Sequence, residues 1–177
     1  MSTGSRAERL KEYVRDIPGY PQPGIIFRDI TPLLADREIF REAVELMSRS
    51  WNGRRPDLVA AIEARGFIPG AAIAVKLDAG FVPIRKVGKL PWHTIAEAYQ
   101  LEYGADELQV HSDAVEPGQK VLIVDDVLAT GGTAAAAVRL IRKLGGEVVG
   151  VQVLIELKDL GGRQRLPDVE VISEIVY

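Results

Sequence analysis

The 177-residue sequence predicts an α/β fold in which helices flank a mostly parallel central sheet. Three observations lead to this class. Short apolar runs of strand length alternate with longer segments of helical periodicity, a pattern typical of strand–helix–strand units. Several of these runs are apolar throughout, as expected for strands that are buried on both faces. Hydrophobic residues make up 47% and charged residues 27% of the chain, which is close to the globular average and, at this length, indicates one domain.

The first part of the chain predicts two helices separated by a loop. Residues 5–17 indicate an amphipathic helix, because apolar residues share one face and Ser5 with Glu8 fits a capping box. Residues 18–32 contain too many prolines and glycines for a helix interior and predict a shaped loop or a short strand. Residues 36–51 predict the second helix. The apolar residues at helical spacing are Ala7, Leu10, Val14 and Ile17 in the first helix and Phe40, Val44 and Met47 in the second.

The rest of the chain alternates between predicted strands and helices. A helix of small residues is expected from about residue 68 to residue 77, and another helix at 134–144 ends at two glycines. The strongest strand prediction is VLIVDD, because it is apolar until its last two residues. The predicted strands are 58–62, 81–85, 107–111, 121–126, 148–157 and 169–176.

Two scarce residue types limit the chemistry. The sequence has no cysteine, which excludes a disulfide framework, a thiolate nucleophile and a cysteine-ligated metal site. Its two histidines, His93 and His111, cannot form a three-histidine zinc site. We therefore expect carboxylates, cationic side chains, hydroxyls and backbone amides to carry the function, and we assign neither histidine a catalytic role.

Charge and hydropathy limit the partners and the location. The net charge of −3 argues against a nucleic-acid binder, which normally carries a basic face. The longest uncharged runs are too short and too rich in glycine to span a membrane. The N-terminal residues are charged throughout and do not resemble a secretory signal. We expect a soluble cytoplasmic protein.

The segment VLIVDDVLATGGT, at 121–133, is the most informative part of the sequence. A buried strand ends in Asp125 and Asp126 and leads through a glycine-containing turn into a helix. Glycines let the backbone approach a ligand closely, and the amides at a helix start bind anions. The carboxylates suit vicinal hydroxyls or a divalent cation carried by the ligand. The motif favours a phosphorylated sugar; a solvated strand end before a glycine turn is the alternative. The turn residues are Ala129, Thr130, Gly131, Gly132 and Thr133.

Basic residues follow two other predicted strands. They are Arg65, next to Gly66, after the strand 58–62, and Arg85, Lys86 and Lys89 after the strand 81–85. A run of cations is often only a solvated turn. Because the carboxyl ends of parallel strands meet at one edge of a sheet, these cations could instead hold a second anionic group beside the first.

Five segments of the chain occur in the order and spacing of one known family. They are PQPGIIFRDITPLL, EARGF, IRKVGKLP, LEYG and EPGQKVLIVDDVLATGGT, and they span residues 21–133. The chain resembles the type I phosphoribosyltransferases, which use 5-phosphoribosyl 1-diphosphate (PRPP), and among them the adenine phosphoribosyltransferases. The resemblance implies the type I phosphoribosyltransferase fold over a single domain, residues 1–177, in which about residues 1–35 contribute to a small base-binding hood.

The resemblance also implies a role for each motif. Asp125 and Asp126 would face the ribose hydroxyls of PRPP, and residues 129–133 would cradle its 5′-phosphate. Mg²⁺ would be held mainly by PRPP and water, with no metal ligand from the protein. Glu102, in LEYG, would transfer a proton; without the resemblance, an exposed carboxylate is the simpler interpretation. The diphosphate contacts would be Arg65, Lys86 and Lys89, with Arg85 acting in a neighbouring subunit's site, and the adenine contacts would be Ile26, Phe27 and Arg28.

Two details of the motifs bear on the active-site loops. The turn at 63–65 matches a diphosphate loop in which family members hold a cis peptide. Trp92 and His93 depart from the small or polar residues that the family pattern has in the lid over the site. The differences at Trp92 and His93 do not involve the phosphate-binding residues 129–133 or Glu102.

The implied activity is purine salvage, in which a cytoplasmic homodimer converts adenine and PRPP to AMP and diphosphate with Mg²⁺. Two alternatives remain open. The enzyme could use another purine, hypoxanthine or xanthine, although the IIFRD segment favours adenine. A PRPP-sensing regulator could keep the fold and bind nucleic acid, but the net charge of −3 and the retained Glu102 count against it.

Overall fold

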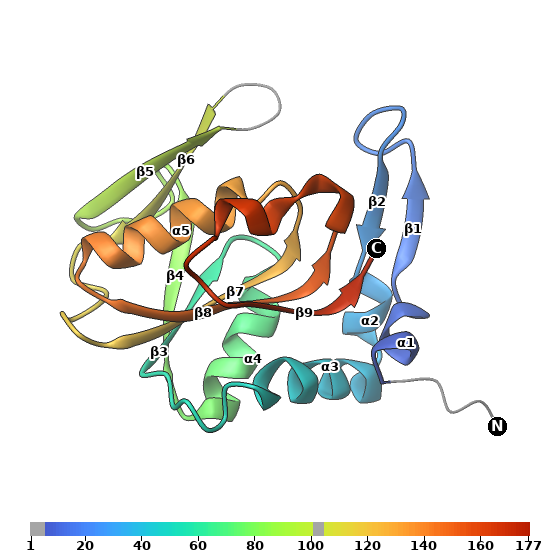
Figure 1. The fold of residues 1–177 in the computed structure, drawn as a ribbon, viewed down its shortest axis with the longest axis horizontal. Helices are drawn as coiled ribbons and strands as arrows, with labels where there is room; N and C mark the ends of the chain where they lie inside the picture. Colours follow the sequence, from blue (N-terminus) through green and yellow to red (C-terminus); the bar gives the residue numbers. More distant parts are fainter. Residues whose placement is uncertain (1–5, 101–104) are drawn as a thin grey trace. The chain divides into compact units, whose positions relative to one another are not determined.

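The computed structural model describes residues 6–100 and 105–177, which divide between two compact units, Met1–Leu46 and Met47–Tyr177. Figure 1 labels the helices and strands of both units. The elements of the first unit are α1 (Arg6–Lys11), β1 (Arg15–Pro18), β2 (Ile26–Asp29), α2 (Thr31–Ala35) and most of α3 (Arg37–Arg49).

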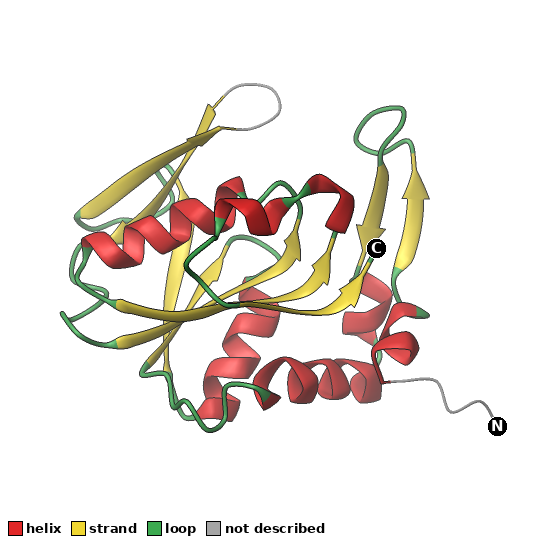
Figure 2. Cartoon of the chain, in the orientation of Figure 1, coloured by secondary structure: helices red, strands yellow, loops and turns green. Residues whose placement is uncertain are grey.

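In the first unit, β1 and β2 form an antiparallel hairpin (Figure 2). The prediction of one helix over residues 5–17 is therefore wrong beyond Lys11, where α1 ends. The backbone after that point pairs across the hairpin, with Ile17 opposite Phe27. The same apolar spacing fits both structures, because Leu10 in α1 and Val14 before β1 are both buried. Pairing between distant residues has overridden a local helical pattern.

The remaining helices of this unit start at recognisable signals. The predicted loop at 18–32 gives way to α2, with Pro32 in its first turn, where a missing amide costs nothing. The helix predicted at 36–51 is confirmed as α3. Asp36 starts it by accepting hydrogen bonds from the amides of Ile39 at 3.1 Å and Glu38 at 2.9 Å, and these bonds lower the pKa of Asp36.

The second unit is built on a seven-stranded sheet with the order β5-β6-β4-β3-β7-β8-β9 (Figure 1). Strands β4, β3, β7, β8 and β9 are parallel, whereas β6 and β5 extend one edge in antiparallel pairing. Helix α4 lies on one face of the sheet and α5 on the other. The bounds are β3 Leu58–Ile62, α4 Phe67–Leu77, β4 Gly80–Lys86, β5 Thr94–Gln100, β6 Ala105–His111, β7 Lys120–Leu128, α5 Gly132–Lys143, β8 Glu147–Glu156 and β9 Val171–Val176.

This architecture confirms the predicted α/β class and the mostly parallel sheet. All six predicted strands are present. The sequence did not predict β5, because its alanines are poor strand formers and it is held in a strand conformation by pairing with β6. The predicted end of the strand at Asp126 is also wrong. β7 continues to Leu128, since Val127 pairs with Ile155 and Leu128 with Glu156 of β8.

The core of the second unit fixes the strands that carry the functional residues. Residues 121–124 of β7 are fully buried, as an apolar run in a parallel sheet should be. Beneath β8, the fully buried Trp51 donates a hydrogen bond from Nε1 to Gln152 Oε1 at 2.7 Å. Gly150 makes room for this indole, because a Cβ there would lie 2.2 Å from the ring.

Candidate functional site

Three neighbouring strands end at the same edge of the sheet, where they bring together the predicted phosphate-binding segment and the segments that carry basic residues. β3 lies between β4 and β7, and all three are parallel. The chain leaves β3 at the turn 63–66, β4 at the basic residues 85–89 and β7 at residues 129–133. We call this last segment the anion loop. Ligands of open α/β sheets bind at such an edge.

The anion loop has the backbone that the sequence predicted. Gly131 adopts a φ of +80°, a conformation that favours glycine, and it stands at the N-terminal cap of α5. The first helical hydrogen bond runs from the amide of Ala135 to the carbonyl of Gly131 at 2.9 Å, so the amides before Ala135 lie at the open, positive end of the helix. A pocket here is lined by Asp125, Val127, Leu128, Ala129, Thr130, Gly131, Thr133 and Ala134. Its geometry suits a phosphate group.

The acidic pair stands beside this pocket, within β7. Asp125 Oδ1 accepts a hydrogen bond from the amide of Asp126 at 2.8 Å. Burial and the neighbouring charge of Asp126 raise the pKa of Asp125 well above its usual value, which favours one proton on this carboxyl pair. Asp126, only 6% exposed, forms an ion pair with Arg65, whose Nε lies 2.8 Å from Asp126 Oδ2. Gly66 keeps this corner narrow, because a Cβ there would lie 2.8 Å from Asp125 Oδ1.

Glu63, which the sequence analysis did not single out, organises the basic segment. Its Oε2 accepts hydrogen bonds from Arg85 Nη2 at 2.9 Å and Nε at 3.1 Å, and its Oε1 accepts one from the amide of Lys86. Arg85 Nη1 also donates to the carbonyl of Lys89 at 3.0 Å. The peptide between Glu63 and Ala64 is cis, as in the loop of the family that the sequence resembles.

A polar chain connects the basic segment with the anion loop. Lys86 Nζ lies 2.8 Å from Asp106 Oδ2, and the hydrogen bond between them raises the pKa of Lys86 and lowers that of Asp106. The hydroxyl of Tyr99 donates to the same Asp106 oxygen at 3.2 Å, and the side chain of Thr133, in the anion loop, lies near enough to Tyr99 to lower the pKa of its hydroxyl against the larger effect of burial. Tyr99 was missed because β5 was not predicted, and Asp106 was missed because its contact with Lys86 depends on the pairing of β6 with β4.

Each of three predicted cations therefore has a carboxylate partner in this structure. The pairs are Arg65 with Asp126, Arg85 with Glu63 and Lys86 with Asp106. An anionic ligand has to draw the cations away from these carboxylates or share them.

The residues predicted to bind adenine lie on β2, in the first unit. Ile26 is exposed, and Phe27 meets Tyr20 edge to face with 5.2 Å between ring centroids. Arg28 forms an ion pair with Asp16 of β1. Among the other predicted residues, Glu102 lies outside the residues that the structure describes.

The described part of the chain has neither a metal-binding cluster of its own nor a membrane-spanning helix. Residues 6–100 and 105–177 contain no group of three or more histidine, aspartate or glutamate side chains that could hold a metal ion by themselves. Within these same ranges, no helix has the length and apolar character needed to cross a membrane.

The fold and the strand-end site together define a phosphoribosyltransferase. Residues 30–176 match the phosphoribosyl transferase domain family, and the chain belongs to this family. The resemblance found in the sequence is thereby confirmed.

Adenine phosphoribosyltransferases are among the relatives that match this chain with high identity. The adenine phosphoribosyltransferase of Thermotoga maritima is 60% identical over 168 residues, which cover 95% of this chain and 97% of that protein. The adenine phosphoribosyltransferase of Thermobifida fusca is 59% identical over 161 residues, 91% of this chain and 92% of that protein.

Solved structures agree with these relatives. The adenine phosphoribosyltransferase of Rhodothermus marinus superimposes with a TM-score of 0.94 at 52% identity, covering 98% of this chain and 99% of that one. The enzyme of Saccharomyces cerevisiae, in complex with adenine and an imino-altritol bisphosphate, has a TM-score of 0.92 at 34% identity, covering 96% and 98%.

Proposed function

We propose that this protein transfers the 5-phosphoribosyl group of PRPP to adenine, giving AMP and diphosphate in purine salvage. The observation that carries the proposal is the strand-end site itself: an anion loop, an acidic pair and Arg65 lie at one edge of the sheet, and Arg65 pairs directly with Asp126. The site occurs in a chain that is 60% identical over 168 residues to an adenine phosphoribosyltransferase.

The anion loop binds the 5′-phosphate of PRPP through backbone amides and the hydroxyls of Thr130 and Thr133. Asp125 and Asp126 accept hydrogen bonds from the ribose hydroxyls. The raised pKa of Asp125 lets this carboxyl also donate a hydrogen bond when it holds a proton. Together these groups fix the ribose ring, so that its C1′ atom faces the incoming base.

Arg65, Lys86 and Lys89 bind the diphosphate. As the bond between C1′ and the diphosphate oxygen breaks, its electron pair stays with the diphosphate, and these cations stabilise the charge that develops there. In the free protein Arg65 pairs with Asp126 and Lys86 pairs with Asp106, so the diphosphate has to share these cations with the two carboxylates or displace them.

The donor set fits a Mg²⁺ ion that arrives with PRPP. Asp125 and Asp126 offer the oxygen ligands that Mg²⁺ prefers, but the described residues 6–100 and 105–177 form no cage of three such groups. Bound Mg²⁺ would neutralise charge on the leaving diphosphate. Activity should therefore require added Mg²⁺ and be lost with a chelator.

Adenine binds on β2, through the backbone and apolar atoms of Ile26, Phe27 and Arg28. The lone pair of adenine N9 forms the new bond to C1′, and the proton lost from N9 passes to Glu102. A closed site keeps out the water that would otherwise hydrolyse PRPP.

The protein acts as a cytoplasmic homodimer, with Arg85 of one subunit reaching the site of the other. The support lies on α4 and β4, where apolar side chains are exposed: Val75 is 84%, Ile68 43% and Phe81 39% exposed. Large apolar side chains that remain exposed in one part of the chain are typical of an interface between chains. Light scattering coupled to gel filtration tests this, and a monomer would contradict it.

Substrate choice can be tested in a single competition experiment. The protein is incubated with PRPP, Mg²⁺ and a mixture of adenine, guanine, hypoxanthine and xanthine, and the nucleotides formed are identified by mass spectrometry. AMP as the main product supports the proposal. IMP or XMP alone would overturn the choice of adenine, and no nucleotide at all would favour a PRPP-binding regulator.

A further inference from the structure

The turn that follows β8 lies directly behind the anion loop. The amide of Leu157 donates to the carbonyl of Leu128 at 2.9 Å, so this turn starts beside the end of β7. Further along it, a Cβ added to Gly162 would lie 2.4 Å from the carbonyl oxygen of Ala129, and one added to Gly131 would lie 2.3 Å from that of Gly162. The two backbones touch with no room for a side chain between them. The position of Gly162 therefore limits where the anion loop can lie.

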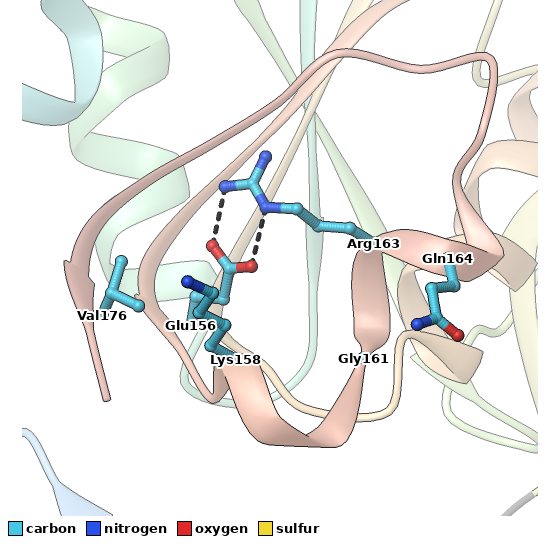
Figure 3. A pocket seen from close by; sticks show the side chains of 6 residues that line it. All are labelled: Glu156, Lys158, Gly161, Arg163, Gln164 and Val176. Carbon is cyan, nitrogen blue, oxygen red and sulfur yellow. Dashed lines mark hydrogen bonds and ion pairs between the residues drawn. The ribbon is translucent and has the colours of Figure 1, made fainter.

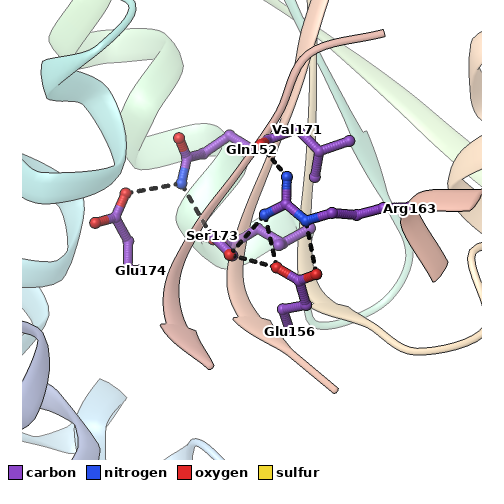
Figure 4. Close-up of polar contacts among 7 residues, drawn as sticks. Gln152, Glu156, Arg163, Val171, Ser173 and Glu174 are labelled. Atoms are coloured by element: carbon purple, nitrogen blue, oxygen red, sulfur yellow. Dashed lines mark hydrogen bonds and ion pairs between the residues drawn. The ribbon is translucent and has the colours of Figure 1, made fainter. Parts of the chain in front are cut away.

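The next residue, Arg163, anchors this turn to the sheet (Figure 4). Its Nε and Nη2 each donate to the carboxylate of Glu156, the last residue of β8, at 2.7 Å. Its Nη1 donates to the carbonyl of Val171 at 2.6 Å, and its Nη2 to Ser173 Oγ at 3.1 Å. The hydroxyl of Ser173 donates to Glu156 Oε2 at 2.6 Å. We call these residues the Arg163 cluster; it joins the 3₁₀ turn Gly162–Arg165 to β8 and β9.

The charged groups of the Arg163 cluster are paired with each other by hydrogen bonds. Glu156 is only 6% exposed, and the hydrogen bond from Arg163 lowers the pKa of Glu156, so this carboxylate is ionised at neutral pH. A two-pronged bond between a guanidinium and a carboxylate fixes direction as well as distance. Lysine has a single ammonium and cannot reproduce this geometry.

A ligand-binding role for Arg163 is less consistent with its contacts. Arg163 and Glu156 line an open pocket together with Lys158, Gly161, Gln164 and Val176 (Figure 3). Within this pocket the guanidinium is turned toward Glu156, and all three of its nitrogens already donate to protein oxygens. The contacts fit a residue that positions its own chain segment.

We propose that Arg163 and Glu156 are positioning residues for phosphoribosyl binding. The Arg163 cluster holds Gly162 against the anion loop, and this contact keeps the loop in the conformation that receives the 5′-phosphate. The inference rests on the proposed function and adds to it two residues that do not touch the substrate. It predicts that loosening the cluster weakens binding of the phosphoribosyl part far more than binding of the base.

The test compares wild type with Arg163→Met, Arg163→Lys and a control, Arg54→Met. Arg54 also forms a two-pronged pair, with Glu170, but at the protein surface and without a contact to the anion loop. For each protein, kcat, the KM of PRPP, the KM of adenine and the thermal midpoint are measured. Calorimetric titration with ribose 5-phosphate measures the phosphate site without turnover.

Arg163→Met should raise the KM of PRPP and the Kd of ribose 5-phosphate about tenfold, because a displaced binding group loses much of its effect. The KM of adenine in Arg163→Met should stay within about twofold of the wild-type value. Arg163→Lys should have a KM of PRPP and a Kd of ribose 5-phosphate between those of wild type and Arg163→Met. Arg54→Met should leave all of these constants unchanged. A lower thermal midpoint with unchanged PRPP and ribose 5-phosphate constants would overturn the inference and leave Arg163 a purely structural residue.

Gly162→Ala provides a second variant if Arg163→Met does not fold. Its added Cβ would press on the carbonyl of Ala129, so it should raise the same two constants without touching the guanidinium. Unchanged constants in Gly162→Ala would overturn the contact on which the inference depends. Failure of the proposed function is distinguishable, because it would appear as absence of AMP formation in the wild type, whereas the ribose 5-phosphate titration tests the anion loop separately.

Discussion

Arg65 Nε lies 2.8 Å from Asp126 Oδ2, so a proposed diphosphate contact is paired with a proposed ribose contact. Arg65 lies in the turn that follows β3 and Asp126 lies in β7, and these two strands are neighbours in the sheet. Asp126 is almost fully buried, and a buried carboxylate without a partner is costly. The pair therefore keeps both charges in place in the free protein and makes both available at the same corner when PRPP binds.

Replacing Arg65 tests its role on the diphosphate. In Arg65→Met, kcat/KM for PRPP should fall about 10²-fold, because a preorganised cation opposite the developing charge is lost. Steady-state kinetics with PRPP as the varied substrate measure this effect. A fall smaller than about threefold would remove Arg65 from the mechanism.

Gly66 tests the close packing beside the acidic pair. A Cβ there would lie 2.5 Å from the carbonyl of Ile62 and 2.8 Å from Asp125 Oδ1, so Gly66→Ala should lower the free energy of unfolding by about 1–3 kcal/mol. Gly53→Ala is the matched control, since a Cβ at Gly53 would meet no atom within 4 Å. Urea denaturation measures both, and equal stabilities would contradict the packing described.

Asp106 competes with the diphosphate for Lys86. Asp106→Asn removes this competing carboxylate, so the KM of diphosphate in the reverse reaction should fall about two- to threefold, as expected for loss of a partly exposed ion pair. The pKa of Lys86 should fall at the same time, because the hydrogen bond to Asp106 is what raises it. An increased KM would show instead that Asp106 helps to place Lys86 for binding.

Glu174 should make stability depend on pH in an unusual direction. Burial raises the pKa of Glu174, so its ionised form destabilises the fold above that pKa, and the penalty disappears as the pH falls through it. Glu174→Gln keeps an acceptor for Gln152 Nε2, which donates to Glu174 Oε1 at 3.0 Å. The thermal midpoint of this variant should exceed that of wild type by about 1–3 °C at neutral pH.

Glu170 is the matched control for this prediction, because its ionised form should stabilise the fold rather than destabilise it. Arg54 lowers the pKa of Glu170, so ionised Glu170 contributes stability that is present above its unfolded pKa and lost as the pH falls through its folded pKa. Glu170→Gln should therefore be less stable than wild type at about pH 8, and this difference should disappear only as the pH falls through the lowered folded pKa of Glu170, whereas the difference for Glu174→Gln should shrink as the pH falls through the raised pKa of Glu174. Calorimetric scans over this range measure both; the same sign for both variants would contradict the assignment.

The role proposed for Glu102 has its own test. Glu102→Gln should bind PRPP as wild type does, since the phosphate and diphosphate contacts are retained, but turn over about 10²-fold more slowly, because the carboxylate that accepts a proton is lost. Single-turnover kinetics separate these two steps. Unchanged turnover would remove Glu102 from the mechanism.

Much of the fold and the anion loop could be predicted, because the residues that determine them lie in short contiguous segments of the sequence. The apolar run of β7 and the glycines that follow it are contiguous in the sequence, and the structure has both as expected. The helix over residues 5–17 was wrong because pairing of β1 with β2, which no local window contains, overrides the helical spacing.

The counter-ions of the site could not be predicted for a related reason. Glu63 meets Arg85 across neighbouring parallel strands, and Asp106 meets Lys86 because β6 pairs antiparallel with β4. Such contacts depend on the register between neighbouring strands, and this register cannot be read from local sequence patterns. The contact of Gly162 with the anion loop is likewise a matter of backbone position, which residue identity does not reveal.

Phosphoribosyl transfer at the anion loop can be tested by following AMP and diphosphate together in the wild type and in Gly131→Ala. A Cβ at residue 131 would lie 2.3 Å from the carbonyl of Gly162, at a φ of +80°, so this change distorts the anion loop itself. The wild type should form AMP and diphosphate in equal amounts from adenine and PRPP, and Gly131→Ala should lose most of this activity through a higher KM of PRPP. Equal activity of the two proteins, or diphosphate release without AMP, would contradict this prediction.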